Sequence, residues 1–261
     1  STHGGANRVV TDSTVINKYV RALVAHPTNS SIAYAGTGNG VFKTTNGGAS
    51  WIETNTGIPF STSIRSMAID KTNPNVIYAG TDLNYLYKTT NGGSTWTNIT
   101  NANGFLLQDS FIRTITVDAG NSDIVYVGSD SGRVYKSFDA GTSWSLLSKI
   151  ASVNSVRSIV RHPNDRRIVF AATFGSGVFV SADSGSHWLP MNTGLSDMEI
   201  YVLECDNANP INLYVGTGST GVFRTTYSFV NQPPVLSAIG NQSLFVTQNL
   251  SFRFSSTDGD A

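Results

Sequence analysis

Thr44-Thr-Asn-Gly-Gly-Ala-Ser-Trp51 is the first of four copies of an eight-residue pattern that decides the fold of this chain. The other copies are Thr89-Thr-Asn-Gly-Gly-Ser-Thr-Trp96, Ser137-Phe-Asp-Ala-Gly-Thr-Ser-Trp144 and Ser181-Ala-Asp-Ser-Gly-Ser-His-Trp188. They recur at intervals of about 45 residues, among residues that favour strands. This regular spacing predicts a propeller-type repeat array.

Each repeat contains more than the octet. A leading strand comes first, and five such strands are recognisable, at residues 20–27, 64–70, 112–118, 156–163 and 200–206. Each is followed by Tyr or Phe with a small-residue turn, and then by another short strand. Apolar and polar residues alternate with period two in these runs, and no convincing helical pattern is present. We therefore expect an all-β protein, a five-bladed propeller of four-stranded antiparallel blades, over residues 1–230.

The fifth repeat never completes an octet, so its Trp-bearing outer strand is missing. Residues 8–14 stand about as far before the first leading strand as each Trp-led strand stands before the next leading strand. We expect this N-terminal strand to complete the last blade and to remove the open edges of the ring. The alternative is a larger ring that another chain or further sequence completes.

The octet has its own physical logic. A short Asn or Asp side chain can hydrogen-bond nearby backbone N–H groups and hold a tight hairpin, and the closing Trp can anchor that hairpin by burying a large ring. The pattern resembles the Asp-box (BNR) repeat of sialidases, sortilin-type receptors, xyloglucanase-type glycoside hydrolases and the photosystem II stability factor family. That resemblance implies a structural role for the box residues, which are Asn46, Trp51, Asn91, Trp96, Asp139, Trp144, Asp183 and Trp188.

Residues 231–261 have a different character. They begin with a Pro pair and then alternate strongly, and they resemble a linker and the first strands of a bacterial Ig-like or cadherin-like domain. Such a domain needs roughly 90–100 residues, so a truncated domain is expected here. Asp258 and Asp260 would ligate calcium only in a complete module, so no cofactor and no metal site are predicted. Strands near residues 242–255 could instead pair with a neighbouring subunit and build an extended assembly.

Composition favours an extracellular β-protein. Formal net charge is +0 and charged residues make up 13% of the chain, which argues against nucleic-acid or membrane-surface partners. No hydrophobic run is long enough to span a membrane. The single cysteine, Cys205, cannot form an internal disulfide and is expected to be a small buried apolar residue. We expect a bacterial protein that is secreted or displayed at the cell surface.

The most informative candidates for binding are arginines at one repeat position. Arg21, Arg65, Arg113 and Arg157 occupy the second position of the first four leading strands, and Tyr201 occupies it in the fifth. If leading strands line the central channel, these guanidiniums form a ring that could bind a carboxylate, sulfate or phosphate. The alternative is that each Arg satisfies carbonyls or an acidic neighbour between blades. A second candidate surface is the set of variable turns after the second strands, where Tyr85 and Phe174 could stack on sugar rings.

Catalysis is weakly supported, and no catalytic residue is assigned. The arginine triad, nucleophile pair and upstream motif of a sialidase are not found. Asp70, Asp118 and Asp206 recur at one repeat position, which indicates turn capping rather than the asymmetric acid pair of a glycosidase. We expect a non-catalytic module that binds a glycan or an extracellular protein; the alternative is a polysaccharide-active hydrolase of the Asp-box propeller type.

Overall fold

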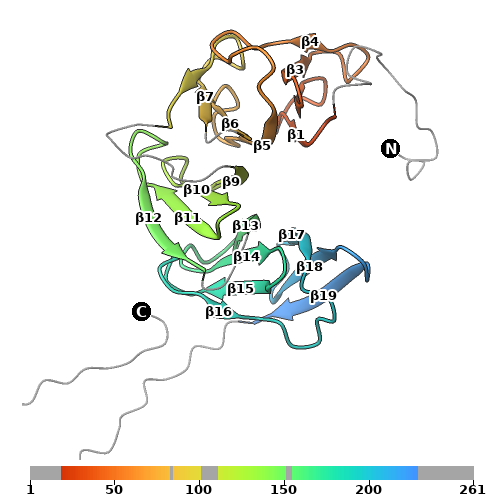
Figure 1. The fold of residues 1–261 in the computed structure, drawn as a ribbon, viewed down its shortest axis with the longest axis vertical. Helices are drawn as coiled ribbons and strands as arrows, with labels where there is room; N and C mark the ends of the chain where they lie inside the picture. The colour runs from red at the N-terminus through yellow and green to blue at the C-terminus, as the bar shows by residue number, and fades with distance from the viewer. Residues whose placement is uncertain (1–18, 83–84, 101–110, 151–154, 229–261) are drawn as a thin grey trace, which may run out of the picture.

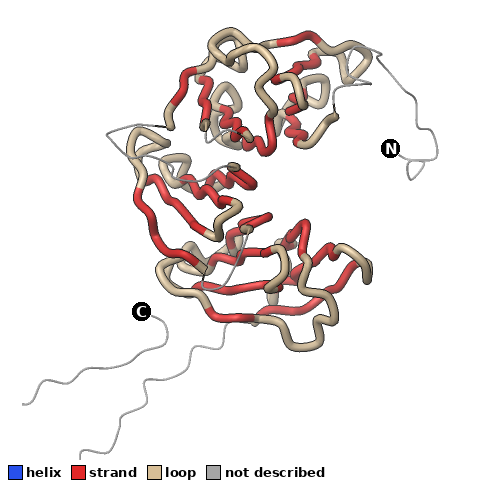
Figure 2. The backbone as a smooth tube through the Cα atoms, viewed as in Figure 1, coloured by secondary structure: helices blue, strands red, loops and turns tan. Residues whose placement is uncertain are grey.

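The computed structural model describes residues 19–82, 85–100, 111–150 and 155–228, which form strands and loops without a helix (Figure 2). In this part of the chain no helix could cross a membrane. The strands make five antiparallel sheets. This confirms the predicted all-β propeller of four-stranded blades, while the predicted closing strand at residues 8–14 and the Ig-like segment lie outside the described residues.

Four sheets have four strands each, in sequence order. The first contains β1 (Ala22–Ala25), β2 (Ala33–Thr37), β3 (Gly40–Thr44) and β4 (Ile52–Glu53). The second contains β5 (Ile64–Ile69), β6 (Ile77–Thr81), β7 (Leu86–Thr89) and β8 (Thr97–Asn98). The third contains β9 (Ile112–Val117), β10 (Val125–Ser129), β11 (Arg133–Ser137) and β12 (Ser145–Lys149). The fourth contains β13 (Val156–Arg161), β14 (Val169–Thr173), β15 (Gly177–Ser181) and β16 (Leu189–Pro190).

The fifth sheet has three strands, β17 (Ile200–Cys205), β18 (Ile211–Thr217) and β19 (Val222–Tyr227). Figure 1 shows the five sheets along an arc, with β1 near one end and β19 at the other. The leading strands β1, β5, β9, β13 and β17 pack against one another in succession and face the middle of the arc. The described residues therefore form an incomplete ring, whose inner wall is built from equivalent positions of the five repeats.

The cores lie between neighbouring sheets. Second strands such as β6, β10 and β14 are buried along their whole length, because each is covered on both faces. The cluster between the first two sheets joins Tyr34 and Val41 of one sheet to Ile77, Tyr87 and Trp96 of the next. Each of the three middle blades thus contributes to two hydrophobic cores, and adjacent blades stabilise each other.

A polar brace crosses each of the first three blade boundaries. The hydroxyls of Tyr34, Tyr78 and Tyr126 donate to the carbonyl oxygens of Gly92, Ala140 and Ser184, at 3.0, 2.9 and 3.1 Å. Each acceptor lies in the octet turn of the following blade and has a positive φ. In the first two cases a lysine, Lys43 or Lys88, donates to the same carbonyl, at 2.8 and 2.7 Å.

The fourth boundary has a different brace. Phe170 and Val180 stand where the earlier blades have the Tyr and the Lys. The fifth repeat has no octet turn that could accept a hydrogen bond from the fourth blade. The ring of Tyr227 instead packs edge-on against Phe170, with 4.9 Å between ring centroids. The loss of the hydroxyl and the ammonium therefore coincides with the loss of the carbonyl that they would bind.

We predict that Tyr78→Phe lowers the free energy of unfolding by about 0.5–1.5 kcal/mol, because it removes one buried hydrogen bond while the ring stays packed. Denaturant unfolding measures the change. Tyr214→Phe is the matched control, since Tyr214 holds the same repeat position and is 39% exposed. Equal stabilities of the two variants would contradict a stabilising role for the brace.

Candidate functional site

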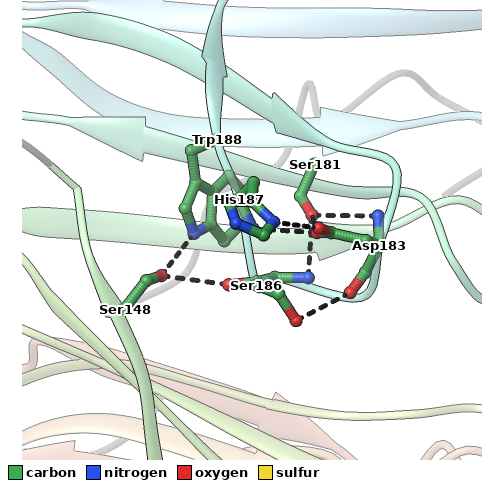
Figure 3. A network of polar contacts seen from close by, with 7 residues as sticks. Ser148, Ser181, Asp183, Ser186, His187 and Trp188 are labelled. Atoms are coloured by element: carbon green, nitrogen blue, oxygen red, sulfur yellow. Dashed lines mark hydrogen bonds and ion pairs between the residues drawn. The ribbon is translucent and has the colours of Figure 1, made fainter. Parts of the chain in front are cut away.

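The four octets fold as tight polar turns. In the fourth, the Asp183 Oδ1 atom accepts from the Ser181 hydroxyl at 2.7 Å and from the His187 backbone N–H at 2.8 Å, and Oδ2 contacts the His187 ring at 2.5 Å (Figure 3). Trp188 then donates its indole N–H to the Ser148 hydroxyl of the preceding blade, at 2.9 Å. The box residues of the second, third and fourth octets thus lie in turns that contact the preceding blade.

Two boxes use Asn and two use Asp, and the difference is chemical. Asn46 and Asn91 accept through Oδ1 and donate through Nδ2 to the hydroxyls of Ser50 and Thr95, both at 2.8 Å. Asp139 accepts from the Ser143 hydroxyl instead, at 2.5 Å. Partial burial opposes ionisation of Asp139 and Asp183, but the hydrogen bonds that they accept outweigh it and hold both pKa values below the ordinary range.

The four arginines at the second position of the leading strands divide into two pairs. Arg21 and Arg65 both form ion pairs with Asp82, which lies in the turn after β6. Arg21 also donates to the Ser63 hydroxyl, at 2.5 Å. Burial opposes ionisation of Asp82, but hydrogen bonds from Arg65 and Ser63 and the charges of both arginines lower its pKa overall. For these two arginines the structure shows an acidic neighbour between blades, which was the alternative interpretation of the sequence.

Arg113 and Arg157 have aromatic rather than acidic neighbours. The Arg113 guanidinium lies 4.7 Å from the Phe111 ring centroid. The Arg65 guanidinium lies 5.5 Å from the same centroid. Arg157 lies 4.9 Å from Phe174 and 5.6 Å from Tyr201. The Nε atoms of both arginines are buried without a hydrogen-bond partner, and within the described ranges neither guanidinium forms an ion pair.

The four arginines, Asp82 and the rings of Phe111, Phe174 and Tyr201 form one group on the inner strands, and this inner-strand group is positively charged around Arg113. Burial lowers the pKa of Arg113, and the neighbouring charges of Arg157 and Arg65 lower it further. Asp130 and Asp82 act in the opposite direction but more weakly. The guanidiniums stay charged at neutral pH, so the group has half-buried positive charge that an anion would stabilise.

The repeat builds this group from three positions. One is the second residue of the leading strand, which supplies the arginines and Tyr201. Another is the residue just before that strand, and the last is the first residue of the turn after the second strand. The latter two are tied together by a backbone hydrogen bond in successive blades, for example Asp82 to Ser63, Asp130 to Phe111 and Phe174 to Ser155.

Sequence reasoning missed part of this arrangement. Phe111 was not singled out, although it is the aromatic residue immediately before a leading strand, and Asp82 was not recognised as a partner of the arginines. Phe174 lies beside Tyr201, with 5.7 Å between ring centroids. Tyr85 is not brought into the group: its ring contact is with Tyr87, at 6.2 Å.

Other polar candidates are committed to turns. His26 and His162 accept backbone N–H groups through Nδ1 at the ends of leading strands. Asp70 and Asp206 do the same through their carboxylates. Cys205 is half-buried, and its burial raises the pKa of the thiol. The parts of the chain with defined coordinates hold no cluster of three His, Cys, Asp or Glu residues suited to a metal.

The sheets, octet turns and inter-blade Trp contacts define a β-propeller of Asp-box repeats. The family model described as photosynthesis system II assembly factor YCF48 matches residues 21–204, which is well over half of the chain, and the protein belongs to this family. No curated protein sequence matches the chain.

Several solved structures share the fold. An ancestral GH74 enzyme aligns with a TM-score of 0.68 at 23% identity, covering 81% of this chain and 31% of that one. YCF48 bound to D1 peptide aligns with a TM-score of 0.60 at 18% identity, covering 80% and 65%. The extracellular domain of a putative one-component system from B. thetaiotaomicron gives 0.62 at 18% identity, covering 83% and 28%. This chain thus spans between about a quarter and two thirds of these proteins, and at such identities the likeness concerns the fold.

We predict that Asp139→Asn/Asp183→Asn weakens the loss of stability in acid. Both carboxyls have lowered pKa values in the folded state, so the stability they contribute is present above the unfolded value near 4 and is lost as pH falls through the folded values. Asn fits the same turn in the first two boxes. Urea unfolding at pH 7 and pH 3 should show a smaller difference for the variant than for the wild type.

The control for net charge is Glu53→Gln/Glu204→Gln, which removes two carboxylates outside the boxes. This control should keep the acid dependence of the wild type. Identical pH dependence of the box variant and the wild type would show that Asp139 and Asp183 contribute nothing in acid.

Proposed function

We propose that this protein is a non-catalytic binding module that recognises an anionic segment of a partner protein through Arg113 and Arg157. The observation that carries the proposal is the unequal treatment of the arginines. Arg21 and Arg65 share an ion pair with Asp82, whereas Arg113 and Arg157 stack on aromatic rings and have no ion pair within the described part of the chain. Aromatic stacking fixes a guanidinium without consuming its N–H donors, so the donors can bind a carboxylate in a bidentate manner.

A peptide fits this group better than a bulk polyanion. The chain has a formal net charge of +0, so attraction of a ligand must come from the local pair rather than from the whole molecule. A side-chain or C-terminal carboxylate would bind the guanidiniums, and the exposed ring of Tyr201 would contact a neighbouring apolar residue. The similarity to YCF48 bound to D1 peptide supports a protein partner.

A glycan is the second candidate ligand, and the exposed aromatic residues Tyr85 and Tyr201 are what favour it. The hydrolase alternative gains nothing from the site, because Asp82 is paired with two arginines and Asp70 and Asp206 cap turns. We further propose that the ring has five blades, that residues 8–14 complete the fifth, and that the protein is secreted or displayed on a bacterial surface.

We predict that Arg113→Ala/Arg157→Ala weakens binding of acidic peptides at least tenfold, since each charge-assisted hydrogen bond contributes about 1.5–3 kcal/mol. The probe is an array of synthetic octapeptides with free C-terminal carboxylates, printed beside their amidated counterparts and beside a glycan array. Peptides selected by the wild type are then measured by calorimetry at low and high salt.

Arg21→Ala/Arg65→Ala is the matched control, because it removes the same number of positive charges from positions whose guanidiniums are paired with Asp82. It should change affinity less than threefold, and thermal unfolding of both variants checks that the fold persists. Selection of glycans with no peptide binding would move the protein to the lectins. Equal losses in the two variants would refute the special role of Arg113 and Arg157.

A further inference from the structure

A pocket of about 260 Å³ lies at the boundary between the fourth and fifth blades, and Arg113 and Arg157 are not among its lining residues. Its apolar lining comes from both blades and includes Val178, Leu195, Leu213, Val215 and Phe223, and Arg224 also lines it. The volume is below the roughly 300–1,000 Å³ that is usual for small-molecule sites, and suits one large side chain.

The repeat identifies what such a pocket normally contains. At the boundary between the first and second blades, the equivalent positions are Val41, Ile58, Ile77, Ala79 and Tyr87, and they form one core cluster together with Trp96. That tryptophan is 4% exposed. The fifth repeat has no octet and no tryptophan, so the same lining surrounds a pocket instead of an indole ring.

The loop that receives Trp96 is duplicated at the pocket. Residues 55–58 read Asn-Thr-Gly-Ile and residues 192–195 read Asn-Thr-Gly-Leu. Asn55 accepts the Val41 N–H at 2.7 Å, and Asn192 accepts the Val178 N–H at 2.8 Å. The loops also share their internal backbone hydrogen bond, from residue four to residue one of the tetrapeptide. The two loops are therefore the same docking element.

Among the described residues, only the first of these loops is covered by a tryptophan. The Trp96 N–H donates to the Thr56 carbonyl at 2.8 Å, and a Cβ atom on Gly57 would collide with the Trp96 backbone. A Cβ atom on Gly194 would meet nothing within 4 Å. The indole of Trp96 donates to the Thr54 carbonyl, and Met191 holds the place of Thr54, with the same backbone hydrogen bond to the third strand.

The chain's neighbouring sequence does not supply a matching aromatic side chain. Gln232 stands at the repeat position of the tryptophan and is followed by two prolines, which cannot donate to a strand ladder. Residues 1–18 contain no Phe, Tyr or Trp, so they offer no aromatic ring for the pocket.

We propose that this pocket is a binding site for a tryptophan side chain in an extended segment of a partner protein. The partner's indole would pack against the five apolar residues and donate its N–H to the Met191 carbonyl, and its backbone N–H would bind the Thr193 carbonyl, as Trp96 does at the first boundary. The site is independent of Arg113 and Arg157, so the two binding activities can be separated by mutation.

The test uses the full chain and a synthetic peptide with the sequence of residues 90–96, Thr-Asn-Gly-Gly-Ser-Thr-Trp, in which the tryptophan carries fluorine at position 5. This peptide ends before the fourth-strand residues, so it does not need the edge of β19. Fluorine NMR follows this peptide without interference from the protein's own tryptophans. We expect a saturable shift of the fluorine signal. In unlabelled peptides measured by calorimetry, replacement of the tryptophan by alanine should reduce affinity at least tenfold.

Thr193→Arg should block the pocket and also reduce affinity at least tenfold, because the exposed Thr193 lines its rim. Thr56→Arg places the same side chain on the matching loop that Trp96 covers, and should leave affinity within twofold of the wild type. The proposal would be overturned if the full chain did not bind the peptide. This includes the case in which the phenylalanines of residues 245–254 occupy the pocket and prevent the peptide from binding. Binding that is equal for the tryptophan and alanine peptides would also overturn it.

Discussion

The arrangement of the first four blades depends on one contact, in which a tyrosine of one blade donates its hydroxyl to the octet turn of the next blade. The acceptor carbonyl points toward the tyrosine because its residue has a positive φ, and the Asn or Asp of the box holds the turn in that shape. Box, tyrosine and tryptophan therefore form a single inter-blade joint. These joints connect the first four sheets, whose leading strands pack against one another in succession.

The position of the arginines follows from these joints. Because equivalent residues of successive blades meet on the inner strands, a residue type repeated at one sequence position becomes a row in space. Four arginines in a row would repel one another, and the protein separates their charges with Asp82 on one side and with the rings of Phe111 and Phe174 on the other. The residue at the neighbouring repeat position, a carboxylate or an aromatic ring, decides whether an arginine forms an ion pair.

The sequence was informative where the physical cause is local and repeated. Period-two alternation predicted the leading strands, and the octets marked the turns, because both depend on residues close in the chain. The sharing of Asp82 by Arg21 and Arg65 was not predictable, since it depends on how two blades approach each other. The pocket between the fourth and fifth blades was missed for the same reason. Residues 55–58 and 192–195 have similar sequences, but the structure is needed to see that Trp96 covers the first loop and that no described tryptophan covers the second.

The burial of the strands changes along the arc, and this has a thermodynamic consequence. In the middle, β10 and β14 are buried at every residue, whereas β1 alternates between half-buried and exposed and β19 is largely exposed. Within the described residues the first and the fifth blade each pack against one neighbouring blade, so opening of this arc costs least at its two ends. A segment that binds the last blade would raise the free energy of unfolding of the whole array, because it binds the folded state and not the unfolded state.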